Sequence, residues 1–161
     1  MKLRKTTPAI VWTCLCCLFL ACADPNDFEE HHPIKNETWS MHEPITFAFD
    51  IADTSALYRF GLHLRYTDAF PWQDLVLFMK TSLPDGSLSQ DTLHCFLFEP
   101  DGKPIGKGHR IKELDADYCL LRFPVPGHYT LCFTQGMRAE QVKGMASFGI
   151  SLKKTAPPTK N

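Results

Sequence analysis

Apolar and polar residues alternate along several short stretches of the chain, with the period of two that is typical of half-buried β-strands. In residues 43–51 the apolar side chains that share one face are Ile45, Phe47, Phe49 and Ile51. In residues 57–66 they are Tyr58, Phe60, Leu62, Leu64 and Tyr66, and the opposite face carries Arg59, His63 and Arg65. Both stretches are predicted to be strands with one face against a core.

Five more stretches of this kind predict strands at residues 74–81, 91–99, 118–125, 127–134 and 147–154. Turn residues separate several of them: Pro84-Asp85-Gly86, Pro100-Asp101-Gly102 and Pro126-Gly127. Residues 135–145 break the alternation, so a short helix or a turn is expected there. Short spacings with chain reversals favour antiparallel pairing. The predicted fold class is therefore all-β, a two-sheet antiparallel sandwich of immunoglobulin-like architecture.

The first 21 residues have the composition of an export signal. They carry three bases and no acid, and an uncharged apolar run extends from Ala9 to Ala21. This run is shorter than the about 20 apolar residues that a membrane-spanning helix needs. The residues before Cys22 resemble a bacterial lipobox, which implies cleavage after Ala21 and lipidation of the Cys22 thiol. A plain secretory signal and an uncleaved anchor are the alternatives.

These features divide the chain into four parts. Residues 1–21 are predicted to be a lipoprotein signal peptide, and residues 22–36 to be the lipidated cysteine and a flexible, polar tether. Residues 37–154 are predicted to form the sandwich domain, and residues 155–161 a disordered tail. Without the signal the chain has 14 bases against 18 acids, which gives no indication of a nucleic-acid partner.

The cysteines and histidines do not indicate a metal site or a disulfide-rich domain. Cys14, Cys16 and Cys17 leave with the signal and Cys22 carries the lipid, which leaves Cys95, Cys119 and Cys132 in alternating strand-like stretches. They are compatible with one disulfide or with buried free thiols. The adjacent His31 and His32 lack a third ligand at a recognisable spacing. No metal site and no cofactor is predicted.

An enzymatic function is not predicted either. The chain contains no G-x-S-x-G motif or comparable setting for a nucleophile. Asp50 and Asp53 lie three residues apart at a strand end, which favours a turn over a pair of catalytic carboxylates.

Three groups of residues resemble the gliding-motility lipoprotein GldH family of Bacteroidetes. The groups are Leu64-Arg65 with Phe70-Pro71-Trp72 and Asp74-Leu75, Asp101-Gly102 with Gly106 and Gly108, and Gln135-Gly136-Met137-Arg138 with Gly144-Met145 and Gly149. The resemblance implies a non-enzymatic lipoprotein of the cell envelope, most simply of the outer membrane. Its implied partners are other envelope proteins of the machinery for gliding and the associated type IX secretion.

The predicted partner surface consists of residues that break the strand pattern or join strands, namely Phe70, Trp72, Gln135, Met137 and Arg138, together with Arg65 on the polar face of the strand at 57–66. Exposed aromatic rings in a connection can anchor a partner, although Trp72 is more simply explained as a plug over the edge of the core. Arg138 has Asp101 and Glu140 as possible mates within the chain. The alternative function is that of a lipid-anchored carbohydrate-binding or adhesin domain.

Overall fold

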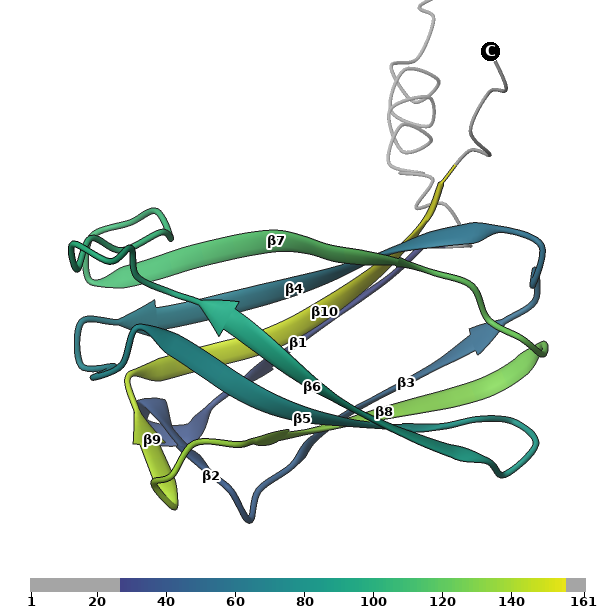
Figure 1. Ribbon diagram of the computed structural model, residues 1–161, viewed down its shortest axis with the longest axis horizontal. Coiled ribbons are helices and arrows are strands. Elements are labelled where there is room, and N and C mark those ends of the chain that lie inside the picture. Colours follow the sequence, from purple (N-terminus) through teal and green to yellow (C-terminus); the bar gives the residue numbers. More distant parts are fainter. Residues whose placement is uncertain (1–26, 156–161) are drawn as a thin grey trace, which may run out of the picture.

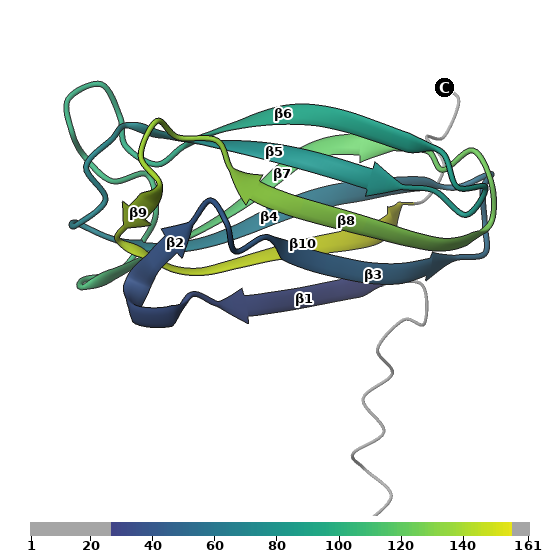
Figure 2. The same ribbon diagram turned by 90° about the horizontal axis from the view of Figure 1, so that it is seen from below.

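The computed structural model describes residues 27–155, and most of them lie in antiparallel sheets (Figure 1). One four-stranded sheet has the order β1-β10-β4-β7, with bounds Phe28–Pro33, Met145–Thr155, Leu57–Thr67 and Ile111–Leu121. The other has the order β3-β8-β5-β6, with bounds Ile45–Ile51, Gly127–Gln135, Asp74–Ser82 and Leu88–Phe96. Figure 2 shows the strands of the second sheet side by side in front of the first, so the two sheets form the layers of a sandwich.

The two-sheet antiparallel sandwich is thus confirmed, but its connectivity is not that of an immunoglobulin domain. Without the short β2 and β9, the remaining eight strands, counted in chain order, give sheet orders 1-8-3-6 and 2-7-4-5. This is the order of a jelly roll, in which most connections cross from one sheet to the other. Alternation along a strand cannot distinguish these topologies, because it reports which face is buried and not which strand lies alongside.

The core is built from aromatic and aliphatic side chains that alternate inward from both sheets. Phe47 and Phe133 of one sheet meet Phe148 of the other, with ring centroids 5.8 and 4.9 Å from the Phe148 ring. All three rings are fully buried. The alternating residues predicted for 45–51 and 57–66 lie in β3 and β4, and most of their apolar side chains are buried.

The first correction concerns the predicted tether, part of which belongs to the fold. Residues 28–33 form β1, which pairs with β10 throughout its length. The half-buried side chains of β1 are Phe28, Glu30 and His32, and the His32 ring packs edge-on against Phe47 at 5.0 Å. The polar composition concealed this strand, because a histidine ring and a carboxylate take inward positions that apolar residues usually fill. The domain therefore begins near residue 28 and not at 37.

Other boundaries also differ from the predictions. The strand expected at 118–125 is β7, which begins at Ile111, because alternating acids and apolar residues extend it backwards. No helix occurs at 135–145, where a turn leads into the short β9 (Gln141–Lys143). β9 pairs with β2 (Thr38–Ser40), which follows the 3₁₀ turn η2 (Lys35–Glu37), and this small sheet closes one end of the sandwich (Figure 1).

Within residues 27–155 there is no helix with the length and apolarity needed to cross a bilayer. The predicted signal peptide, Cys22 and the residues from 156 onwards lie outside the described residues.

Candidate functional site

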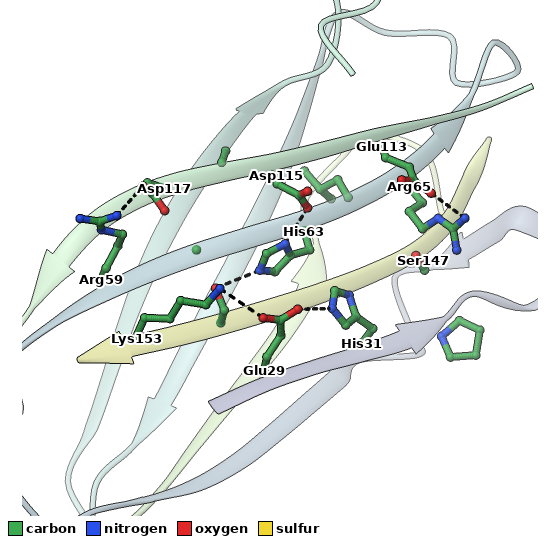
Figure 3. A pocket seen from close by; sticks show the side chains of 15 residues that line it. Glu29, His31, Arg59, His63, Arg65, Glu113, Asp115, Asp117, Ser147 and Lys153 are labelled. Atoms are coloured by element: carbon green, nitrogen blue, oxygen red, sulfur yellow. Dashed lines mark hydrogen bonds and ion pairs between the residues drawn. The ribbon is translucent and has the colours of Figure 1, made fainter. Parts of the chain in front are cut away.

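The outer face of the β1-β10-β4-β7 sheet carries an open groove of about 850 Å³ (Figure 3). All four strands contribute to it, because the side chains that point away from the core in this sheet are mostly polar. The lining residues include Glu29 and His31 of β1, Arg59, His63 and Arg65 of β4, Glu113, Asp115 and Asp117 of β7, and Ser147, Ser151 and Lys153 of β10. We call this feature the sheet groove.

Small residues allow polar side chains to lie flat on the middle of the sheet. A Cβ atom at Gly149 would lie 2.3 Å from Nδ1 of His31, and one at Gly61 would lie 2.5 Å from the Ser151 hydroxyl oxygen. Both glycines occupy interior strands, where a missing side chain normally weakens the sheet. Here the space they leave accommodates His31 and Ser151, and this sets the shape of the groove.

A serine, a histidine and an aspartate form a hydrogen-bonded row across the sheet groove. His63 Nδ1 lies 2.7 Å from Asp115 Oδ1, and His63 Nε2 lies 2.9 Å from the Ser151 hydroxyl oxygen. These distances match a nucleophile, base and orienting acid. Acyl transfer also needs N–H donors for the developing oxyanion. β10 is paired on both sides, with Ser151 opposite Glu29 and Gly61, so the backbone around the hydroxyl is occupied by the ladders. We therefore interpret the two hydrogen bonds as structural: they hold the His63 imidazole ring in a fixed orientation.

Ion pairs frame the row on both sides (Figure 3). Arg59 lies 3.4 Å from Asp117, Arg65 lies 2.7 Å from Glu113, and Lys153 lies 3.4 Å from Glu29. The hydrogen bond from His31, followed by the charge of Lys153, holds the pKa of the Glu29 carboxyl below its usual value. The groove thus combines four carboxylates with three permanent cations and two histidines, and most of these charges are neutralised locally.

Two of the predicted partner residues, Phe70 and Trp72, lie away from the sheet groove. Phe70 is buried and Trp72 is 37% exposed, with the two rings edge to face at 5.6 Å. The loop between β4 and β5 carries both residues, and together with Phe98 and Pro100 they line a hollow of about 510 Å³ at one end of the sandwich. The plug role expected for Trp72 belongs to Phe70. Arg65 lies in the sheet groove, so the predicted residues do not form one surface.

The remaining predicted residues have mainly structural contacts. Gln135 is buried, donates hydrogen bonds to the carbonyls of Ala139 and Glu140, and accepts one from the Met137 N–H. Met137 is half-buried, and its sulfur lies 3.3 Å from the Val76 N–H. Gln135 therefore shapes the turn after β8. Arg138 is exposed and forms no ion pair with any residue of the described range, while Asp101 pairs with Lys103.

The three cysteines within the described range are free thiols, which decides between the two alternatives for them. Cys95 is buried, and this burial raises the pKa of its thiol to about 12. Cys119 is exposed on β7, contrary to the expectation that all three are buried. Across residues 27–155 no three histidine, cysteine, aspartate or glutamate side chains converge in a way that could hold a metal ion.

Fold and site together define an all-β jelly-roll domain with a charge-lined groove on one sheet and an exposed tryptophan at one end. The sequence model of the GldH lipoprotein family matches residues 26–152, which include every described strand except the last three residues of β10. The chain belongs to the GldH lipoprotein family, as its sequence motifs implied.

Two curated relatives have the same family name. The "Gliding motility lipoprotein GldH homolog" of Christiangramia forsetii is 23% identical over 147 residues, which cover 86% of this chain and 90% of the relative. The "Gliding motility lipoprotein GldH" of Flavobacterium johnsoniae is 22% identical over 143 residues, which cover 84% and 89%. These names associate the family with gliding motility and with a lipid anchor in the cell envelope.

Among solved structures, a chain from infectious bursal disease virus is similar to 83% of this chain, with a TM-score of 0.34 and 15% identity. This chain spans only 30% of the viral one. A likeness this distant supports no inference about fold or function.

Proposed function

We propose that this protein is a lipid-anchored, non-enzymatic interaction module of the envelope machinery for gliding and the associated type IX secretion. Cys22 carries the acyl chains, and the outer membrane is the membrane that holds them. The family relationship supports the motility role, and the lipobox supports the anchor. The partner is another envelope protein of the same machinery.

One observation carries the interaction role: Trp72 is exposed at the rim of a preformed hollow. Its ring rests against the buried Phe70, and the wall opposite is formed by Phe98 and Pro100. Phe70 in turn stacks with Phe98 at a ring distance of 6.5 Å, so the aromatic group is held in place before any partner arrives. Tryptophan residues held in this way often dominate the binding energy of an interface.

The position of Trp72 in the fold suits this role. β4 begins at the end of the sandwich where the chain enters from Asp27, and the loop with Trp72 follows the opposite end of β4. A lipid on Cys22 holds the first end near the membrane. The Trp72 end is therefore presented away from it, where a second envelope protein can reach it.

The test is co-purification from envelope fractions after reversible cross-linking in cells. Trp72→Ala should reduce recovery of motility or secretion proteins by about tenfold or more, as expected for the loss of a central tryptophan. Leu88→Ala is the matched control, because Leu88 is also an exposed apolar residue, at 60%, but follows the turn after β5 at the other end. Equal recovery with both variants would contradict the proposal.

A further inference from the structure

We propose that the sheet groove is a binding site for a neutral saccharide, which lies across β1, β10, β4 and β7. The proposal goes beyond the partner contact at Trp72 and concerns a different face of the molecule. It rests on the chemistry of the groove: its charge balance, a serine hydroxyl on its floor that has no protein partner among the described residues, and its open shape.

The charge balance excludes strongly charged ligands. Each arginine or lysine in the sheet groove already faces a carboxylate at 2.7 to 3.4 Å. An anion would compete with these carboxylates, and a cation with the guanidinium and ammonium groups. The carboxylates still have free lone pairs and the arginine and lysine groups still have free N–H bonds, because each ion pair uses only part of their hydrogen-bonding capacity. Rows of charge-assisted donors and acceptors with little net charge are suited to the hydroxyl groups of a neutral sugar.

The floor contains a hydroxyl that is free to bind a ligand. The Ser147 side chain is nine-tenths buried, lines the sheet groove between Pro33 and Arg65, and has no hydrogen bond to any residue in the range that the structure describes. This hydroxyl opens into the groove, where it can donate a hydrogen bond to a ligand hydroxyl and accept another from it. By contrast, the nearby Ser151 hydroxyl is already bonded to His63.

Ring faces in the sheet groove complement the C–H faces of a sugar. The Pro33 ring and the His31 imidazole lie along β1, and the His31 and His63 rings are 5.0 Å apart. Asp115 and Ser151 hold the His63 ring from both sides, so its orientation is set before a ligand binds. Pre-ordered groups lower the entropic cost of binding.

The shape favours a saccharide over a peptide. The sheet groove lies on the face of the sheet, where backbone groups are used in the ladders, whereas an extended peptide gains affinity by adding to a sheet edge. A volume of about 850 Å³ is within the range of ligand sites and is open along its length. Jelly rolls also occur among lectins, although fold analogy alone would not justify the assignment.

The experiment applies the mature full-length chain, purified in detergent, to an array of neutral hexose and N-acetylhexosamine oligosaccharides, acidic saccharides and short peptides. The binding hits are then titrated by calorimetry. We expect neutral oligosaccharides to bind. Glu113→Gln, which keeps side-chain size, and Arg59→Gln, which shortens an exposed side chain and removes its charge, should each weaken binding by about tenfold or more, because each removes a charge-assisted hydrogen bond. Ser147→Trp, which fills the groove, should abolish it.

Lys80→Gln on the other sheet is the control and should leave the affinity unchanged. Circular dichroism and melting temperatures of all variants show that each is folded. Three outcomes would overturn the proposal: no neutral saccharide binding at millimolar concentration, preferential binding of acidic saccharides or peptides, or binding that the three groove variants leave intact.

Discussion

At the scale of single residues, Tyr66 connects the sandwich to the hollow beside Trp72. Its side chain is fully buried at the end of β4, and its hydroxyl donates to the Leu97 carbonyl at 2.5 Å and accepts from the Gly106 N–H at 2.9 Å. Burial raises the pKa of this hydroxyl, so it stays protonated and can donate. The ring also contacts Phe98 at 5.4 Å. Tyr66 therefore holds the segment that forms one wall of the hollow.

Tyr66→Phe should lower the free energy of unfolding by about 1 to 3 kcal/mol, because the Gly106 N–H is left buried without its acceptor while the ring is retained. Urea unfolding followed by fluorescence measures the change. Tyr118→Phe is the control: Tyr118 is 39% exposed, and its hydroxyl has no hydrogen-bond partner within residues 27–155. Similar losses in both variants would show that the Tyr66 hydroxyl contributes nothing specific.

At the scale of elements, the sequence predicts best where one face of a strand is fully apolar. The strands predicted at 43–51 and 57–66 agree with β3 and β4 to within two residues, since every second side chain there is apolar. β1 was missed because Phe28 is its only apolar inward residue. The sheet groove was missed for a related reason: it needs the pairing of β4 with β7 and β10, which alternation does not specify.

One signal for the groove was nevertheless present in the sequence. Arg59, His63 and Arg65 alternate on one face of β4, and Glu113, Asp115 and Asp117 alternate with the opposite charge on β7. Complementary charges at the same period favour cross-strand pairing. Trp72 and Phe70, by contrast, lie in a loop, where no period shows which ring faces the core.

The attachment of β1 to β10 leads to a pH prediction. Glu29 of β1 meets Lys153 of β10, and the pKa of its carboxyl is lowered first by His31 and then by Lys153. A carboxyl whose pKa is lower in the folded chain than in the unfolded chain stabilises the fold above its unfolded pKa, about 4.3, and this stabilisation is lost as the pH falls through the folded pKa.

Glu29→Gln should therefore destabilise the protein slightly at pH 7, by a few tenths of a kcal/mol because the pair is about half exposed, and the difference should vanish towards pH 3. Urea midpoints measured from pH 3 to 7 follow this difference. Glu43→Gln serves as the control, since Glu43 is exposed and its carboxylate makes no ion pair in the described part of the chain. A Glu29→Gln effect that is constant over this range would contradict the assignment.

At the scale of the whole molecule, different segments of the chain lie at the two ends of the sandwich. The chain enters at Asp27, whose carboxylate accepts a hydrogen bond from the Lys154 N–H, so both ends of the described chain meet at one end of the sandwich (Figure 1). Antiparallel pairing places the loop at 122–126 at this end and the turn at 136–140 at the opposite end. The 11 residues of β4 span about 35 Å between them.

The position of β1 shortens the connection between Cys22 and the domain. Between Cys22 and Asp27 the covalent chain extends at most about 18 Å, against about 50 Å for a tether that reached residue 36. A lipid on Cys22 would therefore keep the Asp27 end within one domain diameter of the bilayer and direct the loop with Trp72 outward. The short connection restricts orientation as well as location.

This orientation can be measured with a fluorescent amino acid placed at Arg122 or Arg138, which are both exposed arginines at opposite ends of the sandwich. In vesicles that contain brominated lipid, the probe at position 122 should be quenched more strongly than the probe at 138, because bromine quenches only at short range. Cys22→Ala should release the chain from the vesicles and remove quenching at both positions. Equal quenching at the two positions in the lipidated chain would mean that the sandwich lies flat on the membrane, and then Trp72 could not project away from it.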